Sequence, residues 1–252
     1  MDKLTRLFPS ALNRGEAARK DETSHEDTVQ GTKALLAQMQ SAQGPYEAPV
    51  LGRSYTVHDG VFSHLYAPST AWYAEYLPVQ QGDSFLEIGC GTCVISVTAA
   101  DRGAARVTAI DINPAAVANA KENVKKFGME DRIEVRLGDV YDSLTPEERY
   151  DVIFWNSPFV LLENEQQLSD LERSAFDIGY AAHERFISQA RQHLTERGRL
   201  FIGFSKTLGD YGRLQQLAEK YGYEIRPVRE AESVEKHAVH FEMLELVPTH
   251  MK

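Results

Sequence analysis

The sequence predicts an α/β fold with a doubly wound, largely parallel sheet. From about residue 84, strand-like runs alternate with helical patterns along the chain. Repeated βα units of this kind build a parallel sheet with helices on both faces. A chain of 252 residues can form one such domain with an extension and bury a sizeable core. Such sheets bind ligands at the carboxyl ends of their strands, so the loops there are the expected place for chemistry.

Seven segments have strand-like sequences. The first is a short apolar run, and the second is rich in β-branched residues. The last alternates apolar with more polar positions, which suits a strand with one wetter face. The predicted ranges are 84–88, 106–110, 132–137, 151–155, 200–204, 224–228 and 238–246.

Helical patterns fill the intervals between these strands. The clearest covers residues 114–127, where Asn113 is a good N-cap, Pro114 takes the first helical position and Gly128 ends the helix. A capping box at 145–148 predicts a short helical turn. The other predicted helices are 94–100, 183–197 with Gly198 as its cap, and 211–221.

The chain divides into three expected parts. Residues 1–50 are rich in polar side chains and form an N-terminal extension, with a helix near 29–39. This extension is either partly packed on the domain or a loose tail. Residues 51–79, with a helix at 71–77, precede the sheet on the substrate side, and residues 80–252 form the main domain.

Composition excludes several classes of protein. Lys and Arg total 27 and Asp and Glu total 37, so the formal charge of −10 disfavours a nucleic-acid partner. No apolar run reaches the roughly 18 residues of a membrane span, and the N-terminal apolar stretch is too short for a secretory signal. The only two cysteines are Cys90 and Cys93, which excludes a disulfide framework and indicates a reducing, cytoplasmic location.

The loop after the first predicted strand carries a G-x-G pattern. Gly89 and Gly91 lack side chains, so the backbone can turn tightly and approach a ligand closely. A pyrophosphate-binding loop places a third glycine three positions after the second, where Val94 stands. Glu87 precedes the loop, and a carboxylate there repels a pyrophosphate but suits an ammonium or sulfonium group.

Acidic residues also end the next two predicted strands. Asp111 lies 20 residues after Gly91 and can accept both hydroxyls of a ribose. Asp139 follows the third strand and can accept a hydrogen bond from an adenine amino group. Each acid alone suits a helix cap or a solvated turn, but acids at the ends of three successive strands indicate a nucleoside site.

Together, Glu87-x-Gly89-x-Gly91, Asp111 and Asp139 resemble the motifs of class I S-adenosylmethionine (SAM)-dependent methyltransferases. The resemblance covers roughly residues 80–246. It implies SAM as the cofactor and a Rossmann-like sheet of seven strands, mostly parallel with an antiparallel last strand. Many members have glycine where Cys93 stands, and a side chain there narrows the pocket. The cofactor-binding residues that the resemblance implies are Glu87, Gly89, Cys90, Gly91, Asp111, Ile112, Asp139, Val140 and Asn156.

The fourth predicted strand ends in Asn156-Ser157-Pro158-Phe159. This resembles the Asn-Pro-Pro-Tyr/Phe motif of methyltransferases that act on amino or amide nitrogens, such as release-factor glutamine methyltransferases. Asn156 Oδ1 and a following carbonyl can accept hydrogen bonds from an NH₂ group and aim its lone pair, and Phe159 offers a ring face to the developing cation. Asn156, Pro158 and Phe159 are therefore the predicted catalytic residues. Ser157 replaces the first proline, and by itself the sequence also suits a simple turn.

Two further segments are candidates for the substrate side. Residues 160–180 are rich in acids, among them Glu163, and suit either a lid for a cationic substrate or a solvated helix face. Before the sheet, Phe62, His64, Tyr66 and Thr70 are candidates for a wall over the acceptor. His64 can act as a base, although an isolated histidine more often packs or lies on the surface.

Cys90-x-x-Cys93 has the spacing of a redox pair or of half a zinc site. Two sulfurs cannot complete a tetrahedral zinc site and the chain has no other cysteine, so no metal is expected. A helix N-terminus would lower the pKa of a thiol there, which leaves a redox role open.

We therefore predict a SAM-dependent N-methyltransferase that acts on an amino, amide or guanidino nitrogen of a small-molecule acceptor, possibly a cationic one. A protein substrate ranks second and RNA third. The alternatives are a small-molecule O-methyltransferase with His64 or His183 as its base, an NAD-dependent oxidoreductase, which Val94 argues against, and a non-catalytic nucleoside-binding protein. The sequence gives no indication of the oligomeric state.

Overall fold

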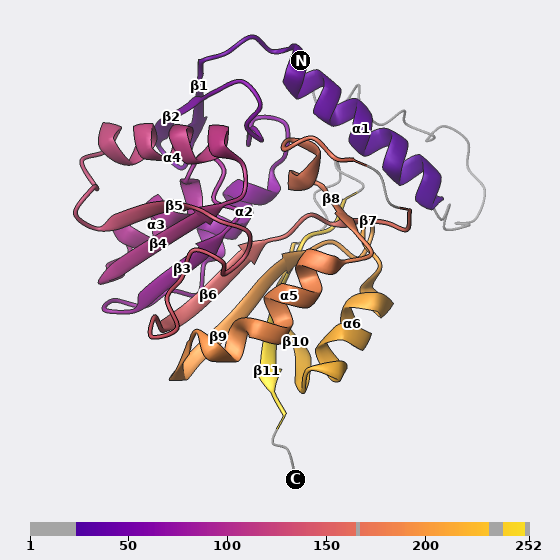
Figure 1. Cartoon of the computed structure of the whole chain (residues 1–252). Helices are drawn as coiled ribbons and strands as arrows, with labels where there is room; N and C mark the ends of the chain where they lie inside the picture. The colour runs from indigo at the N-terminus through magenta and orange to yellow at the C-terminus, as the bar shows by residue number, and fades with distance from the viewer. Residues whose placement is uncertain (1–23, 165–166, 232–238, 250–252) are drawn as a thin grey trace.

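The computed structural model describes residues 24–164, 167–231 and 239–249 (Figure 1). The main sheet has seven strands in the order β10-β11-β9-β6-β3-β4-β5. Strands β3, β4, β5, β6 and β9 are parallel, and β11 is antiparallel to both β9 and β10. This confirms the predicted fold class and the antiparallel last strand. The strands are β3 (Ser84–Ile88), β4 (Arg106–Asp111), β5 (Ile133–Leu137), β6 (Tyr150–Asn156), β9 (Leu194–Phe204), β10 (Tyr223–Glu230) and β11 (Glu242–Pro248).

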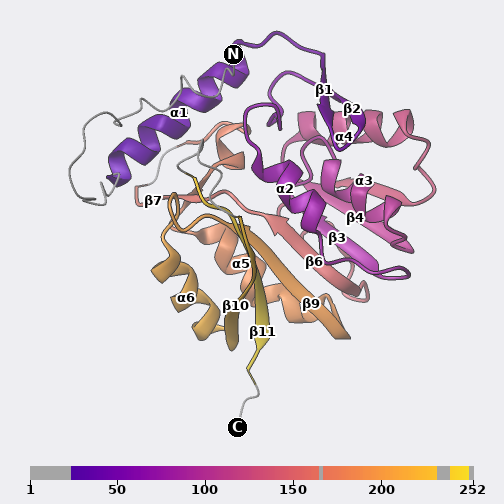
Figure 2. The ribbon, with the colours of Figure 1, turned by 180° about the vertical axis from the view of Figure 1, so that it is seen from behind.

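Helices cover both faces of this sheet (Figures 1 and 2). In the interior strand β3, Phe85 packs into the apolar cluster on one face and Leu86 into the cluster on the other, as the two-residue period of a strand requires. The first cluster includes residues of α2, α3 and α4, and the second includes residues of α5 and α6. The helices are α2 (Ser69–Tyr76), α3 (Val94–Asp101), α4 (Pro114–Lys126), α5 (Ala181–Gln189) and α6 (Tyr211–Lys220).

The start of α4 follows from its local sequence. The side chain of Asn113 accepts a hydrogen bond from the N–H of Ala115, and Pro114 occupies the first helical position, as predicted. Asn119 and Asn123 lie further along α4 and are fully buried. Their amide oxygens accept hydrogen bonds from the backbone N–H groups of His58 and Thr56, each at 2.9 Å. These bonds attach the segment before the sheet to the domain.

Three smaller elements lie outside the main sheet. β1 (Tyr46–Val50) and β2 (Arg53–Val57) form an antiparallel hairpin, and β7 (Val160–Leu162) pairs in parallel with β8 (Phe176–Ile178). Helix α1 (His25–Ser41) lies apart from the main sheet, on the side of β7 and β8 (Figures 1 and 2). We call the described residues 160–164 and 167–178, with the 3₁₀ turn η2 (Glu172–Ser174), the flap. Helix α1 packs on the flap, because side chains of the two share one apolar cluster.

The helix predicted at 183–197 was too long. Helix α5 and the 3₁₀ turn η3 (Ala190–Gln192) are followed by β9, whose first residue Leu194 pairs with Tyr150 of β6. Gly198 does not cap a helix. A Cβ there would lie only 2.8 Å from the carbonyl oxygen of Tyr150, so the close approach of β6 explains this glycine.

Other boundaries also differ from the predictions. Residues 145–148 form the predicted short turn without a helix, and the N–H of Thr145 donates to Glu148 Oε2 at 2.8 Å, as a capping box requires. The last strand begins at Glu242, and the predicted start at residue 238 lies outside the described residues. β1, β2, β7 and β8 were not predicted. Among the described residues, no helix is both long enough and apolar enough to cross a membrane.

Candidate cofactor and acceptor site

A cavity of about 1250 Å³ lies at the carboxyl ends of β3, β4 and β6. Its volume exceeds the roughly 300–1,000 Å³ of an ordinary small-molecule pocket. Glu163 does not line it and is exposed just beyond β7. All other predicted site residues line it: Phe62, His64, Tyr66, Thr70, Glu87, Gly89, Cys90, Gly91, Asp111, Ile112, Asp139, Val140, Asn156, Pro158 and Phe159.

The loop between β3 and α3 adopts backbone angles that favour glycine. Gly89 has φ +67° and Gly91 has φ +51°, in the left-handed region that costs other residues about 1–2 kcal/mol. A Cβ at Gly89 would lie 3.2 Å from the indole Nε1 of Trp155. A Cβ at Gly91 would meet no heavy atom of the described residues within 4 Å, so this backbone borders open space. The loop can therefore receive a ligand against its main chain.

Asp111 links this loop to the end of β4. Its Oδ2 accepts the N–H of Gly91 at 2.8 Å, and its Oδ1 accepts the N–H of Asn113 at 2.9 Å. A carboxylate offers about four acceptor positions, so each oxygen can still accept one more hydrogen bond. Burial raises the pKa of Asp111, and the backbone N–H groups of Asn113, Gly91 and Ile112 oppose that rise. The residue can therefore hold the loop and accept ribose hydroxyls at the same time.

Glu87 is a buried acid beneath the same loop. Its side chain is almost fully buried and accepts a hydrogen bond from the hydroxyl of Ser96. Burial raises the pKa of Glu87 to about 8, which the bonds from Ser96 partly offset. A positively charged ligand in the cavity would favour the ionised form, because opposite charges attract strongly where water is excluded.

Asp139 is paired within the protein. Nη2 of Arg185, on α5, lies 2.9 Å from both of its carboxylate oxygens, and both residues line the cavity. Sequence reasoning did not single out Arg185. Only the fold brings α5 next to the loop after β5, so no local signal identifies the pair.

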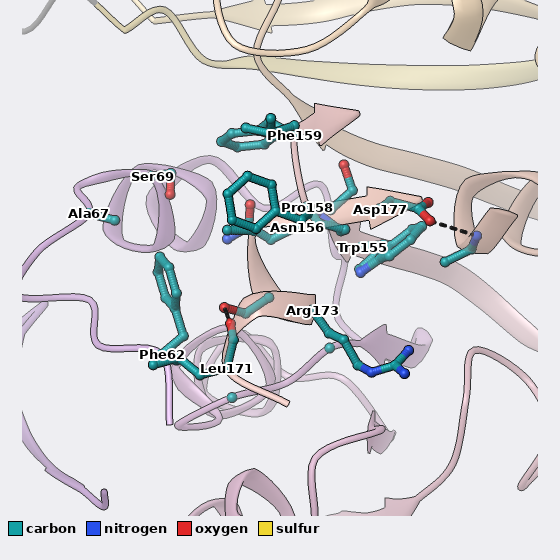
Figure 3. A pocket seen from close by; sticks show the side chains of 18 of the residues that line it. Phe62, Ala67, Ser69, Trp155, Asn156, Pro158, Phe159, Leu171, Arg173 and Asp177 are labelled. Carbon is teal, nitrogen blue, oxygen red and sulfur yellow. Dashed lines mark hydrogen bonds between the residues drawn. The ribbon is translucent and has the colours of Figure 1, made fainter. Parts of the chain in front are cut away.

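The acceptor loop 156–159 is anchored at both ends. Ser157 Oγ donates to the carbonyl oxygen of Gly203 in β9 at 2.8 Å, and the N–H of Ser157 reaches the same oxygen at 3.3 Å. The hydroxyl of Tyr180 donates to the carbonyl oxygen of Phe159 at 2.7 Å. The hydrogen bonds of Ser157 thus supply part of the rigidity that a proline would give. Figure 3 shows Asn156 and Pro158 beside Trp155 and Phe159 at the cavity.

His64 has both ring nitrogens engaged. Nε2 lies 3.2 Å from the carbonyl oxygen of Ala48 and Nδ1 lies 3.3 Å from the hydroxyl of Thr92. A carbonyl can only accept, so Nε2 carries the proton and Nδ1 accepts from Thr92. Burial lowers the pKa of His64. The residue connects the β1–β2 region to the G-x-G loop, and this geometry leaves no free nitrogen for a base.

Asp177 belongs to the acid-rich stretch 160–180 and His183 was one of the two candidate bases, but the sequence did not predict that they form a buried pair. Asp177 Oδ2 lies 2.7 Å from His183 Nδ1 and also accepts the backbone N–H of His183, while Oδ1 accepts the N–H of Ala182. Asp177 lines the cavity and caps the start of α5 (Figure 3). His183 Nε2 is buried without a hydrogen-bond partner among the described residues. The sequence placed Asp177 in a candidate lid but gave no sign of its hydrogen bonds to the start of α5 and to His183.

The two cysteines are free and buried. The pKa of the Cys90 thiol is raised well above its usual range, first by its contact with Cys93 and then by burial. A protonated thiol is a poor nucleophile and metal ligand, so the redox role that the sequence left open has no support in this geometry.

These residues fit a sulfonium nucleoside. Gly91 offers open backbone, Asp111 retains acceptor positions for hydroxyl groups, and Glu87 supplies a buried acid that a cation would ionise. The third glycine of a pyrophosphate loop is absent, because Val94, the first residue of α3, stands at its position. The fold and the site together define a class I SAM-dependent methyltransferase domain.

Comparison with known families agrees with this class. Residues 53–226 match the family described as methyltransferase small domain, and the chain belongs to this family. The match runs from the start of β2 into β10. It confirms the predicted family and SAM as its cofactor.

Curated relatives are similar over about half of the chain. A Methanocaldococcus jannaschii protein named as a candidate protein N5-glutamine methyltransferase is 33% identical over 135 residues, covering 52% of this chain and 66% of that protein. The release factor glutamine methyltransferase of Cereibacter sphaeroides is 31% identical over 151 residues, covering 56% of this chain and 54% of that protein. The chain thus matches less than two thirds of the length of either relative.

A solved structure shows the same fold. The 16S rRNA N2 methyltransferase of T. thermophilus, in complex with AdoMet and guanosine, superposes with a TM-score of 0.56 at 20% identity. The superposition covers 81% of this chain and 50% of that chain. The names of these similar proteins refer to protein and RNA substrates, so they support neither the expected small-molecule acceptor nor the expected exclusion of nucleic acid.

Proposed function

We propose that the chain transfers a methyl group from SAM to an amide or amino nitrogen held at the loop 156–159. The observation that carries this proposal is the position of Asn156. It ends β6 and lines the cavity, and within the described part of the chain no hydrogen bond engages its side chain. Its Oδ1 is therefore available to accept an N–H of the acceptor.

The residues of the chain orient the reacting nitrogen. When bound, SAM supplies an electrophilic methyl group on a positively charged sulfur. Asn156 Oδ1 and a carbonyl of the same loop accept the two N–H bonds of the acceptor, so its lone pair points in one direction. Ser157 holds this loop on β9 through Gly203, which keeps the two acceptors at a fixed separation.

Proton chemistry favours a neutral reacting nitrogen. The nitrogen forms its bond to the methyl carbon as the carbon–sulfur bond breaks, and the nitrogen then releases a proton. An ammonium group would first need a base. Asp177 is a carboxylate in the cavity wall, but its oxygens already accept hydrogen bonds from the start of α5 and from the His183 ring. A primary carboxamide or an aryl amine therefore suits this site best.

The curated relatives agree with that preference. Both carry names that specify glutamine, whose side chain is a primary carboxamide. An attack by oxygen or carbon would require a base close to the acceptor. His64 has no free nitrogen and His183 does not line the cavity, so neither supports an O-methyltransferase.

Asn156→Ala tests the proposal. Transfer of a labelled methyl group from SAM is measured with a panel of carboxamides, amines and a glutamine-containing peptide, and the methylated atom is located by tandem mass spectrometry. We expect N-methyl products, a turnover lowered roughly 10²- to 10³-fold by Asn156→Ala, and a SAM dissociation constant that stays within threefold of wild type. Asn164→Ala is the matched control, because Asn164 is exposed and does not line the cavity. Methylation of oxygen or carbon, or equal turnover in Asn156→Ala, would contradict the proposal.

A further inference from the structure

Helix α1 lies outside the part of the chain that matches the family. The family match begins at residue 53, and α1 ends at Ser41. Nevertheless α1 lies against the flap, near the loop that follows β6 (Figures 1 and 2). The helix is therefore a feature of this chain placed next to the proposed acceptor site.

One face of α1 forms part of the cavity wall. Thr28, Gly31, Thr32 and Leu35 line the cavity, and their spacing of three and four residues puts them on the same side of the helix. Leu36 and Met39 are buried in the apolar cluster with β7 and β8. The packing of these two side chains on the flap fixes which face of α1 borders the cavity.

The flap ties this wall to the acceptor end of the cavity. β7 begins at Val160, directly after Phe159 of the acceptor loop. Phe62 and Tyr66, from the segment before the sheet, pack against the same cluster as Leu36. The adenine end, at Asp139, is instead bordered by Arg185 of α5. The cluster thus joins α1 to the two segments that flank the acceptor loop.

Charge in the cavity restricts what can bind. Among the described residues that line it are six carboxyl groups and two guanidinium groups, and the guanidinium group of Arg185 is paired with Asp139. Asp27 of α1 and Asp170 and Asp177 of the flap are three of these six carboxyl groups. An excess of negative charge raises the energy of any anionic ligand, including a phosphate backbone.

We propose that α1 is the acceptor-selecting wall of the cavity and that the acceptor is a small, non-anionic nitrogen compound. The cavity volume of about 1250 Å³ is larger than that of an ordinary small-molecule pocket. The cavity can therefore hold a second small molecule beside a nucleoside cofactor. Thr28, Gly31, Thr32 and Leu35 of α1 line this volume, so a molecule bound beside the cofactor would meet α1. The role assigned to α1 rests on the proposed function in one respect, namely that the reacting nitrogen is held at the loop 156–159.

A bulky substitution on α1 tests this assignment. Thr32→Trp fills space at the wall, and Ala37→Trp makes the same change on the exposed face of α1. Binding of L-glutaminamide, agmatine and histamine is measured by saturation-transfer NMR on the full chain with S-adenosylhomocysteine present. A glutamine-containing peptide and total tRNA serve as macromolecular probes. Calorimetry of S-adenosylhomocysteine binding checks that each variant is folded, and we expect values within threefold of wild type.

The assignment predicts that at least one small compound binds, that Thr32→Trp weakens its binding at least tenfold, and that Ala37→Trp changes it less than twofold. It is overturned if Thr32→Trp leaves binding unchanged, or if only the peptide, only the tRNA or no probe binds. The proposed function fails separately. If small compounds bind in an α1-dependent way but receive the methyl group on oxygen, the role of α1 is supported and nitrogen methylation is refuted.

Discussion

Replacing Asp111 by alanine removes the carboxylate that connects the G-x-G loop to β4. The backbone N–H groups of Gly91 and Asn113, at 2.8 and 2.9 Å from its oxygens, would lose their partner. A cofactor ribose would lose its two acceptors as well. The loss of two hydrogen bonds to a charged group, partly compensated by water, weakens SAM binding by about 2–3 kcal/mol. That is a rise in the dissociation constant of roughly 30- to 140-fold.

Calorimetric titration with SAM measures this change, and thermal unfolding separates it from loss of structure. Asp111→Asn keeps one carbonyl oxygen, so we expect a smaller effect on both measurements. The control is Asp101→Ala, because Asp101 forms an exposed ion pair with Arg53 away from the cavity. A SAM dissociation constant for folded Asp111→Ala within threefold of wild type would refute the assignment of Asp111 to the ribose.

Three further variants test the site. Ser157→Ala removes the bond to Gly203, and we expect turnover to fall about fivefold to tenfold, with Ser157→Thr retaining activity in the same assay. The carboxyl of Glu87, with its pKa raised to about 8, is protonated below that pH, so SAM affinity should rise by up to about tenfold per pH unit until pH 8 and then level off. Calorimetry at several pH values checks this, and Glu87→Gln should flatten the profile. Tyr180→Phe leaves the Phe159 carbonyl without its donor and should cost about 1–3 kcal/mol in a denaturant titration, whereas unchanged stability would contradict the anchoring role.

The sheet and the cofactor residues followed from local patterns. The strand that ends at Ile88 and the helix that begins at Pro114 have short-range signals, namely an apolar run before glycine and an Asn-Pro cap. Parallel strands deliver their carboxyl ends to one edge, so Asp111 and Glu87 come together once the strands are placed.

The acceptor side depends on contacts between distant segments. The sequence of residues 160–180 indicated an acid-rich lid or a helix face, and the structure forms two short strands there. Glu163 and Asp177 are both acids in this stretch, but only Asp177 reaches the cavity, because the pairing of β7 with β8 turns that residue inward. Residues 194–197 have a helical pattern that pairing with β6 overrides. No local signal could have shown that α1 lines the cavity.

A crystal structure with bound S-adenosylhomocysteine tests the central claim most directly. The account predicts electron density for the nucleoside across the ends of β3 and β4, with its ribose hydroxyls within hydrogen-bond distance of Asp111 and its sulfur facing Asn156. A nucleoside bound elsewhere, or no density in this cavity at saturating ligand, would contradict it.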